Sequence, residues 1–292
     1  MRDRVKVAVF KTVSAVLEAL PLRTDVSLLS WALPKVLRRS TKRAYLRANL
    51  ATVTGGRASD PAYERHTDRA LASYGQYWAE GAKLPALSPA QRASGFVIGE
   101  GLEHLEAAYA TGRGVIVALP HIGSWEWGGS IIADHGMPMT VVAEELTPPA
   151  LFEWFCEKRE RLGITVEGLN DSAGSKLLQV LQGGGVVGLL CDRDIQGGGA
   201  PVSFFGSPVT VPAGPATLAL RTGAVLLTAA CYIGPVDGHH AVISAPIPAE
   251  RLGKLREDVY RVSQLVTSSL EGLIRRAPEQ WHVLEDRFAP VP

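Results

Sequence analysis

The chain has 292 residues, of which 46% are hydrophobic and 20% are charged, and its formal net charge is +1. This hydrophobic fraction excludes a disordered chain, and the length predicts one large domain or two closely packed ones. The three cysteines lack CxxC spacing, so a reducing compartment is expected, without a disulfide framework or a zinc site. Neither a signal peptide nor a transmembrane span is expected, because the apolar runs are short or interrupted by Pro and Gly.

The first part of the chain is strongly basic. Residues 1–50 carry eleven Lys or Arg against three Asp or Glu, a net charge of +8. Apolar residues recur there at helical spacing, namely Val5, Val9, Val13 and Val16. The basic side chains further along are Arg38, Arg39, Lys42, Arg43 and Arg47. This pattern fits a helix on an anionic lipid surface, and it fits equally a helical lid with a solvated face. No recognised nucleic-acid-binding motif accompanies it, so no nucleic-acid partner is expected.

In chain order, the sequence first predicts a helical portion over residues 1–83, with breaks near Pro21, Pro34 and the turn at 54–56. From residue 84 to 292, short β-branched runs alternate with helical segments. This alternation predicts an α/β fold with a mostly parallel central sheet flanked by helices. The expected strands are Phe96–Gly99, Val115–Leu119, Met139–Ala143, Ile164–Val166, Val186–Leu190, Val225–Ile233 and Ala241–Ser244. The expected helices are Leu102–Thr111, Ser124–His135, Pro148–Leu162, Ser172–Gln182, Pro212–Thr222 and Lys254–Arg276. The Gly-, Pro- and aromatic-rich segment 201–215 is expected to be a loop that lines an apolar site or is packed.

His121 directly follows the strand expected at Val115–Leu119 and Pro120, and Glu126 lies in the first turn of the next helix. On one continuous helix, five residues correspond to about 500° of rotation, so the two side chains would not share a face. His121 is therefore expected in the turn before the helix. There it could accept a proton from a hydroxyl while a carboxylate on its other ring nitrogen fixed the tautomer. The same pattern also fits a packing histidine beside a solvent-facing glutamate.

A second apolar strand, expected at Val186–Leu190, is followed closely by charge. The charged residues are Asp192, Arg193 and Asp194. They mark where the strand emerges from the core, at the edge where open α/β sheets bind ligands. If this strand neighbours the one before His121, Asp192 can reach the imidazole and compete with Glu126 as its partner. The alternative is a surface ion-pair cluster, and the sequence leaves open which carboxylate pairs with His121.

A series of stretches carries a further signal through their order along the chain. They are Gly114–Glu126 with its His-x₄-acid motif, Arg159–Gly163, Cys191–Asp194, Phe204–Gly206, Pro212–Pro215, Leu220–Ala224 and Glu279–Trp281. Each stretch is a weak signal alone. Together they resemble the bacterial lysophospholipid acyltransferase superfamily, in the branch that holds lipid A biosynthesis acyltransferases and actinobacterial phosphatidylinositol mannoside acyltransferases.

The resemblance implies an enzyme that transfers an acyl group from acyl-coenzyme A to a hydroxyl. In that interpretation His121 is the general base, Asp192 looks like its carboxylate partner, and Glu126 is the acid of the motif. The resemblance also implies cations that contact phosphates of the acyl donor or of the acceptor headgroup. The expected substrate-binding arginines are Arg159, Arg193 and Arg221. No metal and no cofactor are implied, and acyl-coenzyme A is a co-substrate.

Lipid A acyltransferases generally carry an apolar anchor at the N-terminus, whereas the N-terminal portion of this chain is basic and amphipathic. This difference favours the phosphatidylinositol mannoside branch. The expected reaction moves a long acyl chain, expected to be palmitoyl, to a mannose hydroxyl of this glycolipid. The expected location is the cytoplasmic side of the cell membrane, as a peripheral protein on the anionic inner leaflet. Two alternatives stay open: an acyltransferase for lipid A precursors, and a non-catalytic lipid-binding protein on the same fold.

Overall fold

A seven-stranded sheet forms the centre of the molecule in the computed structural model, which describes residues 2–234 and 238–288. Its strands are β1 (Phe96–Glu100), β2 (Val115–Leu119), β3 (Met139–Ala143), β4 (Ile164–Gly168), β5 (Val186–Leu190), β8 (Val225–Tyr232) and β9 (His239–Ile243). They lie in the order β1-β9-β8-β2-β5-β3-β4. Every pair is parallel except β8 with β9. The predicted α/β fold with a mostly parallel central sheet is confirmed.

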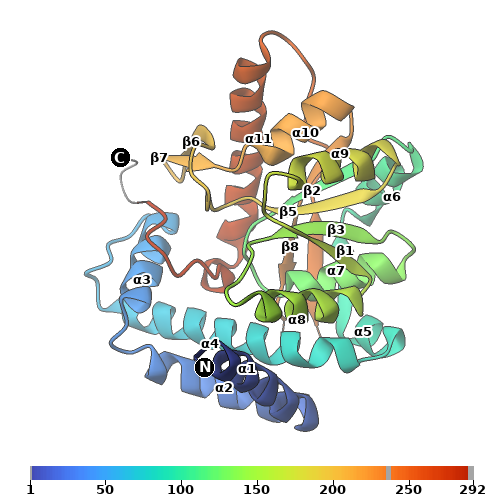
Figure 1. The fold of residues 1–292 in the computed structure, drawn as a ribbon. Helices are drawn as coiled ribbons and strands as arrows, with labels where there is room; N and C mark the ends of the chain where they lie inside the picture. The colour runs from blue at the N-terminus through green and yellow to red at the C-terminus, as the bar shows by residue number, and fades with distance from the viewer. Residues whose placement is uncertain (1, 235–237, 289–292) are drawn as a thin grey trace.

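Helices cover both faces of this sheet (Figure 1). They are α5 (Pro89–Gly95), α6 (Leu102–Ala110), α7 (Trp125–Asp134), α8 (Pro149–Glu160), α9 (Ala173–Gln182), α10 (Gly214–Thr222) and α11 (Leu255–Arg276). Residues of α9, α10 and α11 form one core cluster with Ile116 and Ala118 of β2. Residues of α6 and α7 form a second cluster with Val115 and Val117 of the same strand. Successive side chains of β2 alternate between the two clusters because a strand points them to opposite faces.

The N-terminal helices lie together along one side of the molecule, at the bottom of Figure 1. They are α1 (Arg2–Ala19), α2 (Leu22–Val36), α3 (Thr41–Val53) and α4 (Ala62–Lys83), followed by the short turn η1 (Leu84–Ala86). α2 packs along α4, where a Cβ on Gly75 would come within 2.5 Å of the Leu29 carbonyl oxygen. Among the described residues, none of the helices combines the length and the apolar character that a bilayer span requires.

The predicted helix breaks near Pro21, near Pro34 and after Val53 are confirmed, since α2 ends at Val36 and α3 begins at Thr41. Pro34 lies inside the last turn of α2, which continues to Val36. A proline removes one hydrogen bond within a helix, and the packing of α2 on α4 offsets that loss. The proposed boundary between residues 83 and 84 falls at the end of α4 and stays a prediction.

The Gly-, Pro- and aromatic-rich segment forms a hairpin, so the expectation of a loop is wrong for most of it. Its strands are β6 (Ala200–Phe204) and β7 (Ser207–Val211), which pair antiparallel. Phe205 and Gly206 connect them with φ of 50° and 80°, the positive values that tight hairpin turns require. Pro201 and Pro208 fit because a two-stranded sheet has only edge strands. Phe204 is fully buried, which confirms the packed alternative for this part of the segment.

The segment after α11 returns to the carboxyl ends of the central strands. It begins with the turn η2 (Pro278–Gln280) and runs beside α3 (Figure 1). The buried side chain of Asn49 in α3 donates to the carbonyls of Val283 and Glu285, at 3.0 and 2.8 Å. Trp281 forms a backbone bridge with Ile122, just beyond β2. The segment after α11 therefore connects α3 with the residues that follow β2.

Candidate active site

His121 and Asp192 meet at the carboxyl ends of two neighbouring parallel strands. β2 ends at Leu119 and β5 at Leu190, and these residues are register partners, so each strand delivers its polar residue to the same edge. His121 Nδ1 lies 2.5 Å from Asp192 Oδ1, and the backbone N–H of His121 donates to Asp192 Oδ2 at 2.9 Å. Of the two carboxylates that the sequence left open, Asp192 is the direct partner of His121. We call these two residues the dyad.

The carboxylate of the dyad is ionised. Burial by itself raises the pKa of the Asp192 carboxyl, but the adjacent His121 and hydrogen bonds from His121 and Trp281 lower the pKa to about 2. An ionised carboxylate only accepts hydrogen bonds, so His121 Nδ1 carries a proton, and in the neutral imidazole Nε2 has a lone pair. Nε2 has no partner within residues 2–234 and 238–288, and the His121 side chain is 22% exposed and lines a large cavity. This arrangement suits proton abstraction from a bound hydroxyl.

Glu126 pairs with Arg159 and not with His121. It lies in the first turn of α7, and its Oε1 accepts from Nε of Arg159 at 2.8 Å. The Arg159 guanidinium also lies over the Trp125 ring, 5.2 Å from its centroid. The side chains of Glu126 and Arg159 are only 12% and 16% exposed. The acid of the sequence motif therefore joins α7 to α8 beside the dyad and makes no hydrogen bond with His121.

Replacing Glu126 by glutamine is expected to destabilise the fold. Removing one partner of a mostly buried ion pair costs about 3–5 kcal/mol because the other charge stays buried, which corresponds to a fall in melting temperature of roughly 5–10 °C. Differential scanning calorimetry checks this. Glu167→Gln, which breaks the more exposed pair with Lys176, is the control and should shift the midpoint by about 2 °C or less. Equal shifts in the two variants would contradict the structural role of Glu126.

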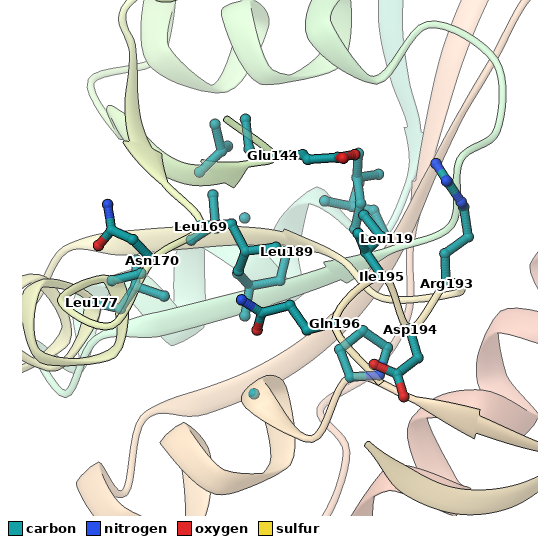
Figure 2. Close-up of a pocket in the computed structure, with 18 of the residues that line it drawn as sticks. Leu119, Glu144, Leu169, Asn170, Leu177, Leu189, Arg193, Asp194, Ile195 and Gln196 are labelled. Carbon is teal, nitrogen blue, oxygen red and sulfur yellow. The ribbon is translucent and has the colours of Figure 1, made fainter. Parts of the chain in front are cut away.

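A cavity of about 1080 Å³ opens beside the dyad. It is larger than the roughly 300–1,000 Å³ of pockets that hold drug-sized ligands. Its aliphatic wall comes from β3, β5, α9 and α10, and Figure 2 shows Leu177 and Leu189 on one side while the charged ends of Glu144 and Arg193 lie on the other. The aromatic residues that line the cavity from α1, α4 and α8 are Phe10, Tyr77, Trp78, Phe152 and Phe155. The cavity thus offers apolar surface for an alkyl chain on one side and charged groups on another.

The three predicted substrate-binding arginines all line this cavity but lie at different places along it. Arg159 is held beside the start of α7 by Glu126. Arg193 follows the dyad aspartate directly, and its Nε and Nη2 donate to the carboxylate of Glu285 at 2.7 and 2.5 Å. Arg221 lies in the last turn of α10, which leads into the amino end of β8, and it makes no hydrogen bond or ion pair within the described part of the chain. The structure brings Arg159 and Arg193 toward the dyad but not Arg221.

The carboxyl-terminal segment supports the dyad through contacts that no local sequence pattern indicates. The indole N–H of Trp281 donates to Asp192 Oδ2 at 2.6 Å, and Arg287 Nε donates to the Asp192 carbonyl oxygen at 2.5 Å. Burial lowers the pKa of the neighbouring His282 to about 3, so this second imidazole is neutral. Only the resemblance of residues 279–281 pointed to this segment. No group of three His, Cys, Asp or Glu side chains that could hold a metal ion occurs in the described residues.

Comparison with known proteins decides the family. A family model described as bacterial lipid A biosynthesis acyltransferase matches residues 8–289. The chain belongs to this family. The phosphatidylinositol mannoside acyltransferase of Mycobacterium tuberculosis is 36% identical over 253 residues, which cover 83% of this chain and 76% of that protein. The phosphatidylinositol mannoside acyltransferase of Mycolicibacterium smegmatis is 32% identical over 246 residues, which cover 83% of this acyltransferase and 78% of the relative. The predicted family is confirmed.

Proposed function

We propose that this acyltransferase moves a long acyl group, namely palmitoyl, from acyl-coenzyme A to a mannose hydroxyl of a phosphatidylinositol mannoside. One observation carries the chemistry: the dyad presents to a large cavity with an aliphatic wall an imidazole nitrogen that has no partner among the described residues. The names of the two mycobacterial relatives support the choice of acceptor. The thioester donor is chosen because a positioned base and an activated carbonyl suffice for the transfer.

In the proposed mechanism, His121 Nε2 removes the proton of the acceptor hydroxyl while the hydroxyl oxygen attacks the thioester carbonyl carbon. The buried carboxylate of Asp192 stabilises the imidazolium that forms. The carbon–sulfur bond then breaks, and the coenzyme A sulfur takes the proton from Nε2 as it leaves. The dyad returns to its starting protonation state without an acyl–enzyme bond.

We propose that the two substrates bind against different parts of the cavity lining. We place the alkyl chain against the aliphatic wall, which includes Val141, Leu177, Leu189 and Leu218. Burial of each CH₂ contributes about 0.8 kcal/mol, so a long chain supplies much of the binding energy of the donor. We place the mannose headgroup on the side of the aromatic residues and Arg159. A role of Arg221 in binding phosphate stays a prediction, since this residue lies toward the opposite edge of the sheet.

The test of the function is acyl transfer from radiolabelled palmitoyl-coenzyme A, with each acceptor supplied separately in detergent micelles. The proposal expects labelled phosphatidylinositol mannoside and no labelled lipid A precursor. Label in the lipid A precursor alone would overturn the choice of acceptor. Tight binding of both substrates without label in either product would favour the non-catalytic lipid-binding alternative.

We further propose that α1 attaches the enzyme to the cytoplasmic side of the cell membrane as a peripheral protein. Val5, Val9, Val13 and Val16 are each more than half exposed, and they form one stripe at helical spacing. The same helix contributes Lys6 and Phe10 to the lining of the cavity. Exposed basic side chains from the end of α2 to the start of α3 include Lys35, Arg38, Arg39 and Lys42. By contrast, Arg43 and Arg47 pair with Glu64 of α4 and so contribute less to a lipid surface.

Replacing Val9 and Val13 together by aspartate is expected to weaken binding to vesicles about 10- to 100-fold. Each buried valine contributes roughly 1.5 kcal/mol, and the added charges repel anionic lipid. Co-sedimentation with vesicles of phosphatidylcholine and phosphatidylglycerol measures the change. Val97 and Leu252, which are 58% and 72% exposed and lie outside α1, form the matched control pair. If the control pair weakens binding as much as the α1 pair, α1 is not the membrane contact.

A further inference from the structure

The dyad carboxylate receives hydrogen bonds from three donors. Oδ1 accepts from His121 Nδ1, and Oδ2 accepts from the backbone N–H of His121 at 2.9 Å and from the indole N–H of Trp281 at 2.6 Å. Asp192 and Trp281 are both fully buried, so water cannot replace a missing donor. The donor from Trp281 is the only one of the three that comes from outside the turn that carries the base.

Trp281 is itself held rigidly. Its ring lies within an aromatic cluster, with ring centroids 5.9 Å from Phe204 and 6.2 Å from Phe288. The residue before it, Gln280, exchanges two hydrogen bonds at 2.7 Å with the backbone of Ile233. The residue after it donates its backbone N–H to the carbonyl oxygen of His121 at 2.7 Å. The segment therefore contacts both members of the dyad, the base through its backbone and the carboxylate through the indole.

We propose that Trp281 is a positioning residue, which fixes the plane of the Asp192 carboxylate so that Oδ1 always faces His121 Nδ1. This inference rests on the proposed function, because Trp281 acts through the general base His121. Each hydrogen bond on a carboxylate oxygen restricts the rotation of the carboxylate about its Cβ–Cγ bond. Without the indole donor, Oδ2 keeps only the backbone N–H, and the carboxylate can turn away from the imidazole. The imidazole then loses the partner that selects the tautomer with a lone pair on Nε2.

A double-mutant cycle on acyl transfer tests this. Trp281→Phe removes the indole N–H and keeps an aromatic ring in the cluster. In the native background it should lower kcat about 10- to 100-fold, as expected for the loss of a hydrogen bond to a charged group, with a change in KM of less than about 3-fold. In the Asp192→Asn background the same substitution should lower kcat less than about 3-fold further, because the carboxylate it positions is gone.

The control for general loss of packing is Trp127→Phe. Trp127 is also buried, and its indole N–H donates to the carbonyl oxygen of Arg92 at 3.0 Å, outside the cavity. This variant should lower the melting temperature and leave kcat within about 2-fold of the native value. A fall of kcat by the same factor in the native and the Asp192→Asn backgrounds would overturn the inference, because it would show that Trp281 acts only through packing.

If Trp281→Phe does not fold, an NMR measurement on the protein without substrate still tests the inference. In ¹H–¹⁵N spectra, the indole resonance of Trp281 should move when Asp192 becomes asparagine, while that of Trp127 stays in place. An unmoved Trp281 resonance would overturn the inference. The outcomes are separable from failure of the proposed function, since an inactive native enzyme contradicts the function, whereas an active one with additive variants contradicts only the role of Trp281.

Discussion

Replacing His121 by alanine is expected to abolish acyl transfer to within the background of the assay, a loss of about 10²–10⁴-fold. The imidazole lies at the carboxyl end of β2 with a buried carboxylate on one nitrogen and the cavity beside it. The loss should appear in kcat, since the base acts in the transition state, while binding of the acyl chain depends on the cavity wall. Initial rates at several concentrations of both substrates separate the two effects.

The matched control is His66→Ala. His66 Nδ1 also contacts a carboxylate, that of Glu279, at 3.0 Å, but its side chain is 44% exposed and it does not line the cavity. This variant should retain native kcat. If His121→Ala retains both transfer and thioester hydrolysis, the assignment of His121 as the base is wrong. Added imidazole should restore part of the activity of His121→Ala, because the deletion leaves space for it at the edge of the cavity.

Replacing Asp192 by asparagine is expected to lower kcat by about 10²–10⁴-fold without a large change in fold. The two donors at Oδ2, the His121 backbone N–H and the Trp281 indole, favour an amide oxygen there, so the amide N–H₂ faces His121 Nδ1. The imidazole must then accept at Nδ1 and carry its proton on Nε2. In that tautomer Nε2 cannot take a proton from the acceptor hydroxyl.

Steady-state kinetics and calorimetry on the same Asp192→Asn preparation test this expectation. Asp134→Asn is the control, because Asp134 also pairs with a buried side chain, Arg92, but lies on the far end of α7. Both variants should lower the melting temperature, and only Asp192→Asn should lower kcat. A fully active Asp192→Asn enzyme would show that the carboxylate is not needed to orient the base.

The central strands could be predicted from sequence because burial on both faces leaves an unmistakable pattern. β2, β3 and β5 have the expected bounds, since each is a mostly apolar run with Gly, Pro or a charged residue within two positions of each end. The hairpin β6–β7 was missed because prolines and glycines interrupt its pattern, and its pairing depends on a tight turn at positive φ. The break near Pro34 could be predicted to within two residues, since α2 ends at Val36.

The members of the site could be listed from sequence, but their pairing could not. Whether Asp192 or Glu126 contacts His121 depends on β5 lying directly beside β2, which is a lateral arrangement that no local pattern encodes. The contact of Trp281 with Asp192 joins residues 89 positions apart through an irregular segment. Arg221 was grouped with the other arginines because a motif carries no information on which end of a helix faces the dyad.

The most direct test of the proposed active site is a crystal structure with a non-hydrolysable thioether analogue of palmitoyl-coenzyme A. We expect the carbon next to sulfur to lie within about 5 Å of His121 Nε2, which leaves space for one hydroxyl oxygen between them. The alkyl chain should lie against Leu177, Leu189 and Leu218. An alkyl chain outside this cavity, or a sulfur more than about 10 Å from the imidazole, would contradict the assignment of the dyad as the centre of acyl transfer.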